Sequence, residues 1–473
     1  MMDRRSFIKG AGAAVCSVGT MSLFGGAARA KSPRGRKPNF VVIFIDDMGY
    51  GDIEPFGSTI NKTPHLNRMA AEGRKLTSFY VAAPVCTPSR AALMTGCYPK
   101  RVGLDNGSWH CVLFPKDPYG LNPKEITIAK VLKDAGYATG CFGKWHLGDQ
   151  PEFLPTSHGF DTYFGIPYSN DMWPPMPSAK RWKVFPCPLP VLRDTKVVDI
   201  VKDMDDQAQL CKRFTDEAVS FIRKNKDKPF FVYLPHAFVH GPRRARKEFM
   251  DRANGNPTRA QIEEVDWSTG QILQTVRDLG LEKDTMVIFT SDNGGAGGCS
   301  SKPLRGGKGS TWEGGLREPT IAWWPGTVPA KSSCDELATT MDLLPTFAAL
   351  GGGKTPDDRV IDGKDISGLL LGRANAKSPH EAFFYYSRSN LRAVRCGKWK
   401  LHTNGQLYNL DKDIGEKQNV AKQNPDVVAR LKKSLDRCRA DLDNKANCRP
   451  VGEVKNPKYL TPMVPNTKKN KRT

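Results

Sequence analysis

The stretch Phe40-Val-Val-Ile-Phe-Ile45-Asp46-Asp47 decides the fold predicted for this chain. Its first six residues are apolar without alternation, which is typical of a strand buried on both faces of a parallel sheet with helices on either side. Two adjacent carboxylates then follow the strand. Because open α/β sheets bind ligands beyond the carboxyl ends of their strands, the stretch predicts both a fold class and the place of a site.

Other segments repeat this pattern along the chain. Further strands are predicted at 75–81, 137–143, 230–234, 285–290 and 321–324. Helices are predicted at 63–73, 126–135, 203–224, 258–279 and 342–350, and the crowded prolines of 173–192 predict a long surface excursion. We therefore expect an α/β fold with a large mixed, mostly parallel sheet flanked by helices.

A glycine cluster at 351–353 predicts a boundary between a large domain, residues 38–353, and a smaller C-terminal α+β subdomain, residues 354–473. In the smaller part, short apolar runs at 382–386, 391–396, 398–402 and 406–410 are separated by tight turns. They predict an antiparallel sheet, followed by a helix near 425–439. The basic end of the chain, residues 468–472, is expected to be solvated.

Residues 1–30 predict an export signal rather than part of the fold. Arg4-Arg5-Ser6-Phe7-Ile8-Lys9 precedes a mildly apolar stretch and Ala28-Arg29-Ala30, which resembles a bacterial twin-arginine signal peptide. We expect a periplasmic or secreted protein without a stable membrane span, because no stretch is apolar for long enough. The pairing of its twelve cysteines does not follow from the sequence.

The net charge of +22 at pH 7 favours acidic partners through long-range attraction. Sulfated polysaccharide, anionic lipid and nucleic acid all have that property. Since the basic residues form no recognisable nucleic-acid-binding module, nucleic acid is not the partner we expect.

Two strand ends carry oxygen ligands. Asp46 and Asp47 follow one predicted strand, and Asp292 and Asn293 follow another. Carboxylates crowded together repel, which raises their pKa values, whereas Ca²⁺ takes carboxylate and amide oxygens as ligands. The pattern predicts a calcium site, and its alternative is a solvated turn before glycine.

The segment Cys86-Thr-Pro-Ser-Arg90 stands before a run of good helix formers. If a helix begins at residues 91–93, Cys86 lies at or near its N-terminus, where negative charge is favoured. Arg90, one turn later, would share its face and could hold an anion or an anionic nucleophile. The alternative is a buried cysteine before a helix.

Lysine and histidine side chains follow further strands. Lys144 and His146 would project to one side of an extended chain and suit an oxyanion and a proton transfer. His236 and His240 follow the strand at 230–234, and Lys308 lies in a glycine-rich segment that allows close approach to an anion. A lone histidine is more often structural than catalytic. The neighbouring Lys144 and the place after a strand favour a functional role for His146.

Together, five segments resemble the type I sulfatases of the alkaline phosphatase superfamily. They contain Asp46-Asp47, Cys86-Thr-Pro-Ser-Arg90, Gly143-Lys-Trp-His-Leu-Gly148, Asp292-Asn293 and Gly307-Lys-Gly309 with Glu313-Gly-Gly315. The resemblance spans residues 38–420. The segments Gly165-Ile-Pro-Tyr-Ser169 and Arg305-Gly-Gly-Lys-Gly309 look most like the arylsulfatase A and N-acetylgalactosamine-6-sulfatase branch.

The resemblance implies an alkaline-phosphatase-like fold and hydrolysis of sulfate monoesters. It also implies that Cys86 is oxidised to Cα-formylglycine, whose hydrate is the nucleophile and faces a single Ca²⁺. The implied ligands of this ion are Asp46, Asp47, Asp292 and Asn293, together with the modified residue 86.

The remaining implied roles belong to positively charged and histidine side chains. Arg90 and Lys144 would hold the hydrate and the sulfate, and His146 would take the proton that collapses the sulfated hydrate. The histidine of the sulfate site falls on His240 rather than His236. With Lys308 it would bind sulfate and protonate the leaving alcohol.

Export and positive charge suggest a sulfated polysaccharide or glycosaminoglycan as the substrate. The expected partner during synthesis is a formylglycine-generating enzyme or an anaerobic sulfatase-maturing enzyme. Two alternatives stay open: a phosphonate or phosphate monoester hydrolase of the same superfamily, and a non-catalytic polyanion-binding protein if Cys86 remains a thiol. Phosphatases commonly use a second metal ion, and ligands for one ion favour sulfate.

Overall fold

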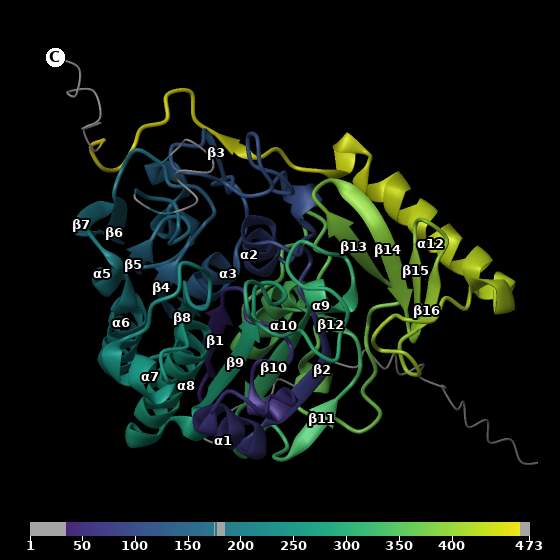
Figure 1. Ribbon diagram of the computed structural model, residues 1–473, viewed down its shortest axis with the longest axis horizontal. Coiled ribbons are helices and arrows are strands. Elements are labelled where there is room, and N and C mark those ends of the chain that lie inside the picture. The colour runs from purple at the N-terminus through teal and green to yellow at the C-terminus, as the bar shows by residue number, and fades with distance from the viewer. Residues whose placement is uncertain (1–34, 175, 177–184, 464–473) are drawn as a thin grey trace, which may run out of the picture.

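The computed structural model describes residues 35–174, 176 and 185–463 (Figure 1). The expected export signal and the basic end of the chain lie outside these residues. Within them, eleven strands form one large mixed sheet that runs through the molecule. A separate four-stranded antiparallel sheet lies to one side, so the predicted α/β fold class is confirmed.

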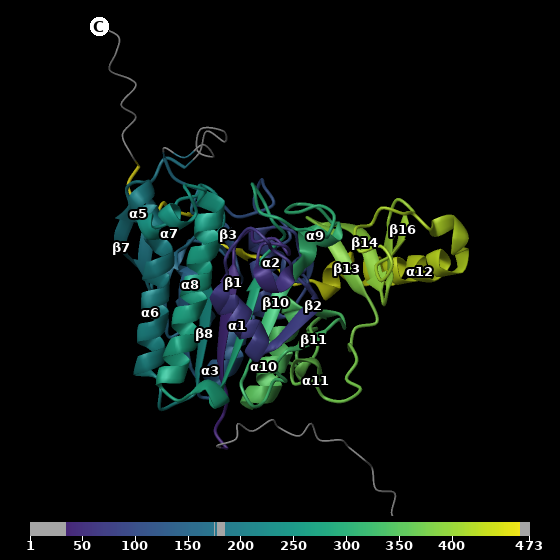
Figure 2. The same ribbon diagram turned by 60° about the horizontal axis from the view of Figure 1, so that its bottom comes forward.

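The central strands of the large sheet run parallel to one another. In spatial order they are β9 (Thr285–Ser291), β1 (Asn39–Ile45), β8 (Phe230–Pro235), β4 (Ala138–Lys144) and β5 (Thr162–Ile166). Beyond β9, β10 (Arg317–Trp323) is antiparallel both to β9 and to β2 (Arg74–Tyr80), so β2 points the same way as β9. These five central strands and β2 therefore present their carboxyl ends at one edge, the upper edge in Figure 2.

Short strands complete the sheet at its two sides. They are β11 (Ser332–Cys334) and β12 (Ala338–Thr339) beside β2, and β6 (Leu189–Arg193) and β7 (Lys196–Val201) beyond β5. A two-stranded ribbon pairs β3 (Tyr119–Gly120) with β17 (Gly452–Glu453).

Helices cover both faces of the large sheet. They are α1 (Pro64–Glu72), α5 (Met204–Ala208), α6 (Leu210–Lys224), α7 (Lys247–Arg252) and α8 (Pro257–Asp278) toward one side, and α2 (Cys86–Thr95), α3 (Ile128–Asp134), α10 (Leu343–Gly351) and α11 (Ser367–Leu370) toward the other, with the short α9 (Glu313–Leu316) before β10.

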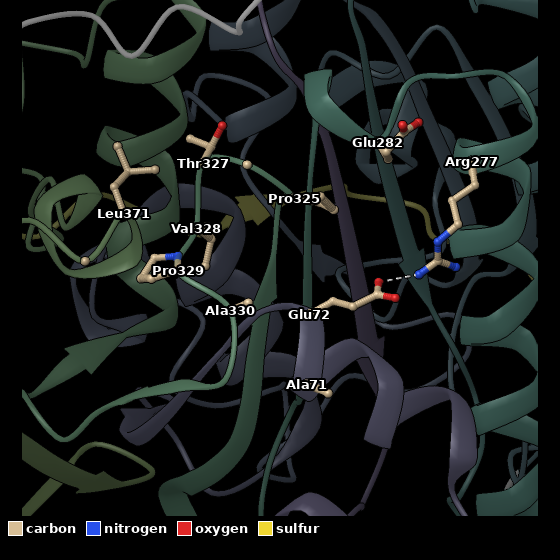
Figure 3. Close-up of a pocket in the computed structure, with 12 residues that line it drawn as sticks. Ala71, Glu72, Arg277, Glu282, Pro325, Thr327, Val328, Pro329, Ala330 and Leu371 are labelled. Atoms are coloured by element: carbon tan, nitrogen blue, oxygen red, sulfur yellow. Dashed lines mark hydrogen bonds and ion pairs between the residues drawn. The ribbon is translucent and has the colours of Figure 1, made fainter.

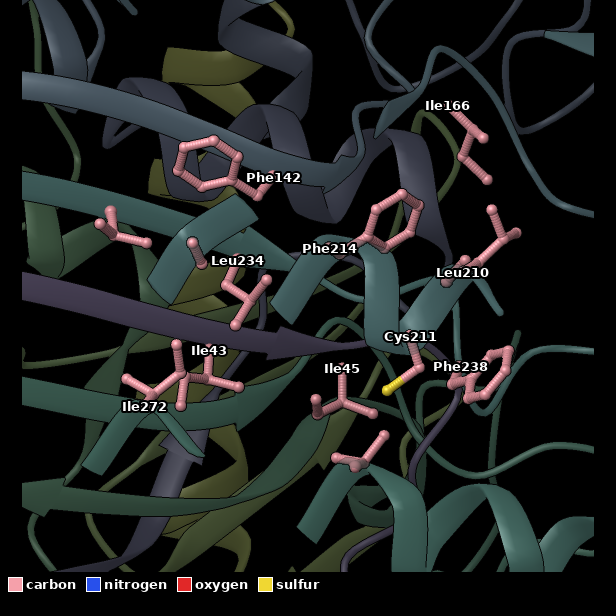
Figure 4. Close-up of a cluster of buried hydrophobic side chains, with 14 of the residues drawn as sticks. Ile43, Ile45, Phe142, Ile166, Leu210, Cys211, Phe214, Leu234, Phe238 and Ile272 are labelled. Atoms are coloured by element: carbon pink, nitrogen blue, oxygen red, sulfur yellow. The ribbon is translucent and has the colours of Figure 1, made fainter. Parts of the chain in front are cut away.

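The side chains of β1 alternate between these two layers. Val41, Ile43 and Ile45 belong to the apolar cluster of α1, α6 and α8, part of which Figure 4 shows around Ile43 and Ile45. Phe40, Val42 and Phe44 belong to the cluster of α2, α3 and α10 on the other face. Each apolar side chain of the run is thus buried, which explains why the run does not alternate with polar residues.

The C-terminal sheet contains β13 (Phe383–Ser387), β14 (Asn390–Cys396), β15 (Trp399–His402) and β16 (Leu407–Asn409), in that spatial order. The helix α12 (Pro425–Leu442) packs Leu431 and Leu435 onto this sheet. Figure 2 shows the sheet and helix beside the β2 side of the large sheet. The sheet and the helix predicted from the apolar runs and their turns are both present.

The expected surface excursion at 173–192 is wrong for the residues that the structure describes. Trp173, Phe185 and Cys187 are buried, and Leu189 begins strand β6 of the large sheet. Prolines among apolar residues without a period suit an irregular buried segment as well as a surface loop, and the pattern alone does not separate the two.

Two further observations concern the described part of the chain. None of its helices is both long and apolar enough to cross a membrane. None of the eleven cysteines in this described part forms a disulfide bond.

Candidate active site

Buried carboxylates meet at the carboxyl edge of the sheet. β1 and β9 are parallel neighbours in which Ile45 is paired with Ser291, so Asp46-Asp47 and Asp292-Asn293 leave the sheet side by side. All four side chains are buried. The Asn293 Nδ2 donates to Asp47 Oδ1 over 2.8 Å. The oxygen ligands predicted from two distant segments therefore do converge.

Cys86 lies at the first residue of α2, with Val85 as the capping residue. The helix thus begins earlier than residues 91–93, and every one of its residues is buried. The Cys86 Sγ lies 3.6 Å from Asp46 Oδ1 and 3.6 Å from Lys308 Nζ. Burial and the neighbouring Asp46 raise the pKa of the Cys86 thiol to about 12. An unmodified thiol here is protonated at neutral pH, which makes it a poor nucleophile.

Arg90 connects the carboxylates to the end of β4. Its Nη2 lies 2.8 Å from Asp292 Oδ2 and 3.3 Å from Asp46 Oδ2. Its Nη1 donates to the Lys144 carbonyl oxygen over 2.8 Å, and the whole guanidinium is buried. These contacts give Arg90 the task of positioning the carboxylates, in addition to any contact with an anion.

Two lysines point at the same carboxylates. Lys144 Nζ lies 2.5 Å from Asp46 Oδ2, and Lys308 Nζ lies 2.6 Å from Asp47 Oδ1. Burial by itself would raise the pKa of Asp46, but Lys144, His240 and Arg90 together hold that pKa well below its usual range. The pKa of Asp47 is likewise lowered, because Lys308 and His240 outweigh the effect of burial.

His146 does not continue an extended chain, contrary to the expectation from the sequence. Its backbone adopts the left-handed region with φ at 61°, and β4 ends at Lys144, so residues 144–146 are not extended throughout. The ring Nε2 lies 2.9 Å from the Leu113 carbonyl oxygen, and a carbonyl only accepts, so Nε2 carries the proton. Burial and Lys144 lower the pKa of His146 well below its usual value. The buried Nδ1, which has no hydrogen-bond partner among the described residues, therefore holds a free lone pair.

The two histidines after β8 face different surroundings. His240 Nε2 lies 3.7 Å from Asp47 Oδ2, while its Nδ1 donates to the Gly241 carbonyl oxygen over 2.5 Å. His236 instead contacts the Ser268 hydroxyl of α8 over 2.9 Å and is fully buried. The geometry thus brings His240 to the carboxylates and leaves His236 in a structural position.

The carboxylate cluster fits a hard divalent cation. Ligand atoms of Asp46, Asp47, Cys86 and His240 all lie within 4.8 Å of one another. The buried Oδ1 of Asn293 has no hydrogen-bond donor within the described residues. Burial and the nearby Asp46 raise the pKa of Asp292 to about 7. A cation would stabilise both the Asn293 oxygen, which lacks a donor, and the charged form of Asp292, which Asp46 destabilises.

Sequence reasoning missed two hydroxyl residues of the site. Ser169 Oγ accepts from Lys144 Nζ over 3.1 Å. Thr87 Oγ1 donates to the His146 carbonyl oxygen over 3.0 Å and accepts from Leu113 N–H over 3.1 Å. The polar run after β5 was a usable signal for Ser169, because β5 is another parallel strand that ends at this edge. Thr87 gave no such signal.

The C-terminal sheet also reaches the site, through the loop that carries Lys308. Glu416 Oε2 accepts from the backbone N–H of Glu313 over 2.7 Å, and its carbonyl oxygen accepts from Arg305 Nη1 over 2.8 Å. Lys400 Nζ lies 3.0 Å from Glu313 Oε1 and 2.9 Å from Glu416 Oε1. Both ends of the loop are thereby fixed to the smaller sheet, in which the sequence indicated no functional residue.

A separate cavity of about 810 Å³ lies away from this cluster (Figure 3). Its lining includes Glu282, which precedes β9, and Pro325, which follows the antiparallel β10, so it lies toward the amino ends of the parallel strands. An ion pair between Glu72 and Arg277 crosses its wall. None of the predicted site residues lines this cavity.

The comparisons with known proteins agree with this geometry. The sulfatase family model matches residues 38–353, and a model of the C-terminal part of N-sulphoglucosamine sulphohydrolase matches residues 307–441. Human arylsulfatase A is 38% identical over 460 residues, covering 86% of this chain and 89% of the relative. The N-acetylgalactosamine-6-sulfatase of dog is 38% identical over 401 residues, covering 80% and 73%.

Solved structures give the same result. The crystal structure of Ps i-CgsB in complex with k-i-k-neocarrahexaose superimposes with a TM-score of 0.75 at 30% identity. The match covers 88% of this chain and 95% of that one. The chain therefore belongs to the sulfatase family and is a sulfuric ester hydrolase.

Proposed function

We propose that this protein hydrolyses O-sulfate esters of sugars with a formylglycine made from Cys86 and one bound Ca²⁺. The observation that carries the proposal is the convergence of Cys86, the oxygen ligands of two strand ends and the two lysines on one buried point. An unmodified cysteine with its pKa raised to about 12 would be a poor nucleophile at neutral pH.

Asp46, Asp47, Asp292 and Asn293 would hold the calcium ion. When bound, it would withdraw electron density from a sulfate oxygen as a Lewis acid. Formylglycine at position 86 would supply, as its hydrate, an oxygen nucleophile and a second hydroxyl through which sulfate is released. An ordinary serine at this position would be left as a stable sulfate ester.

Lysine and histidine side chains of this protein would stabilise the charge on sulfate and transfer the protons. Lys144 and Lys308 place positive charge where negative charge spreads over the sulfate oxygens. The Nδ1 lone pair of His146 is suited to accept the proton of the hydroxyl that expels sulfate. His240 and Lys308 lie on the exposed side of the carboxylates and would bind sulfate and donate a proton to the departing alcohol.

The proposed substrate is an O-sulfated sugar of a polysaccharide or glycosaminoglycan. Support comes from the net charge of +22, from the neocarrahexaose bound in the similar Ps i-CgsB structure and from the relatives that are N-acetylgalactosamine-6-sulfatases. We further propose twin-arginine export to the periplasm or the medium. Because this route exports folded chains, the oxidation of Cys86 by a formylglycine-generating or anaerobic sulfatase-maturing enzyme would have to take place in the cytoplasm, before the chain folds.

Mass spectrometry of the peptide that contains residue 86 tests the modification. We expect the mass of the aldehyde rather than of the thiol when the protein is produced with a maturation enzyme. Cys86→Ala should abolish sulfate release, whereas Cys211→Ala, a change at another buried thiol, should leave the activity close to that of the wild type. Full activity with an unmodified thiol would refute the proposed nucleophile.

Release of inorganic sulfate tests the substrate class. Suitable esters are 4-nitrophenyl sulfate, galactose 6-sulfate and N-acetylgalactosamine 6-sulfate, assayed beside the corresponding phosphate and phenylphosphonate monoesters. We expect the highest kcat/KM with a sugar sulfate. A preference for phosphate or phosphonate esters would instead support the alternative hydrolase of the same superfamily.

A further inference from the structure

One large aromatic side chain is exposed close to the active site. Trp109 has 52% of its surface exposed, and it is the one aromatic among the strongly exposed large apolar residues of the described chain. Water is an unfavourable environment for an indole, and such residues on a surface commonly mark a binding site. Tryptophan also combines a large contact area with few rotatable bonds.

Neighbouring rings support the indole. The Trp109 ring lies 4.3 Å from the ring of Phe114, which is buried and has the ring of Phe185 5.1 Å away on its edge. The His110 ring stacks on Phe114 at 5.3 Å. A tight turn, in which the Gly107 N–H donates to the His110 carbonyl oxygen over 2.7 Å, fixes the backbone of residues 107–110. The aromatic platform of Trp109, His110 and Phe114 is therefore formed before a ligand arrives, which lowers the entropy cost of binding.

The same loop, residues 106–114, is fixed to the catalytic residues. The backbone of Leu113, next to Phe114, accepts from His146 Nε2 over 2.9 Å and donates to Thr87 Oγ1 over 3.1 Å. Thr87 directly follows Cys86. At the start of the loop, Asn106 Nδ2 donates to the Ser389 hydroxyl in the β13–β14 turn over 2.6 Å. The loop thus spans the rim from the carboxyl edge of the large sheet to the C-terminal sheet.

We propose that Trp109, supported by Phe114 and His110, is a stacking subsite for a pyranose ring of the substrate. A pyranose presents C–H groups on its faces and hydroxyls at its edge, so a flat aromatic ring can cover a face while the sulfate group enters the cluster of Lys144 and Lys308. The proposal rests on the proposed function and adds to it the residue that would recognise the sugar rather than the sulfate.

The test compares Trp109→Ala, Trp109→Phe and the wild type. With N-acetylgalactosamine 6-sulfate and with a sulfated disaccharide, Trp109→Ala should raise KM about tenfold with kcat changed less than about twofold. Trp109→Phe should recover most of the loss. Inhibition by inorganic sulfate, which probes the anion site alone, should be the same in all three proteins. Val198→Ala, at a residue 51% exposed on the edge strand β7, is the surface control.

Binding without turnover gives a second measure. In the Cys86→Ala background, calorimetric titration with N-acetylgalactosamine 6-sulfate should show about tenfold weaker binding when Trp109 is also alanine. Equal KM and equal binding with and without the indole would overturn the subsite. An equal loss of inorganic sulfate binding would also overturn it, because Trp109 would then only support the loop. Absence of sulfate release by the wild type would instead count against the proposed function.

Discussion

Replacement of Lys400 by methionine tests whether the C-terminal sheet is held to the active-site loop by a buried ion network. Lys400 is fully buried and lies within 3.0 Å of Glu313 Oε1 and 2.9 Å of Glu416 Oε1. Burial would raise the pKa of Glu313, but Lys400 and Arg317 hold it below the usual range. The Glu313 carboxylate is therefore charged in the folded protein, and it shares this ammonium group with Glu416.

The expected loss follows from what each carboxylate keeps. Glu313 would retain the hydroxyls of Tyr80 at 2.5 Å and Tyr385 at 2.7 Å, and Arg317 at 3.4 Å. Glu416 would retain the Glu313 N–H and His402 Nε2 at 3.2 Å. Removing one partner of a buried ion pair costs about 3–5 kcal/mol, because the remaining charge stays desolvated. We expect a loss of about 4 kcal/mol in the free energy of unfolding, together with a lower kcat as the Lys308 loop loosens.

Urea denaturation measures this loss, and sulfate release measures the effect on the loop. Lys398→Met is the matched control: it alters an exposed lysine two residues away, in the turn between β14 and β15, and it should change stability by less than about 0.5 kcal/mol. Adding Glu416→Gln to Lys400→Met should restore part of the stability, since it removes a carboxylate that has lost its ammonium partner. A Lys400→Met protein within about 1 kcal/mol of the wild type would refute the reasoning.

Three further predictions concern the metal, a helix cap and pH. Chelation with EDTA should abolish sulfate release and lower the melting temperature, and CaCl₂ should restore both better than MgCl₂ does; unchanged melting would contradict a metal site. Asp266→Ala should cost about 2 kcal/mol in urea denaturation, because its carboxylate accepts from the N–H groups of Leu66 (2.8 Å) and His65 (3.2 Å) in the first turn of α1. Burial raises the pKa of Asp149 to about 7, so its contribution to stability is full below the unfolded value near 4 and is lost as pH rises through 7. Between pH 5 and pH 8, Asp149→Asn should therefore gain about 2 kcal/mol relative to the wild type, and a pH-independent difference would count against this assignment.

Most of the core of the fold could be predicted because its signals are local. The buried run at 40–45 and the similar runs at 230–234 and 285–290 have apolar residues facing both helical layers. Apolar residues on both faces are needed only in a strand that helices cover on both sides. The predicted ligand pairs at 46–47 and 292–293 follow such strands directly, so the parallel pairing of β1 with β9 was enough to bring them together.

The rest depended on tertiary contacts that leave no local pattern. β6 pairs with β5 only through residues 192 and 193, and its Pro190 lies outside that pairing, so its sequence resembles a loop. The orientation of His146 depends on a left-handed backbone and on Leu113, a residue 33 positions away. Lys400 and Glu416 lie in and beside an ordinary antiparallel sheet, and their importance comes from Glu313, which precedes β10 of the large sheet.

The charges of the site predict a link between metal binding and substrate binding. Three buried carboxylates, Asp46, Asp47 and Asp292, are matched by the permanent positive charges of Arg90, Lys144 and Lys308. Without a metal ion the cluster is therefore close to neutral, and lysines that point at carboxylates have little charge left for an anion. With a divalent cation among the carboxylates, the same residues form a site with an excess of about two positive charges, which suits a sulfate ester and the doubly charged sulfate it releases. The lysines can serve an anion only if the cation takes over the carboxylates, so metal binding and substrate binding should be coupled in this protein.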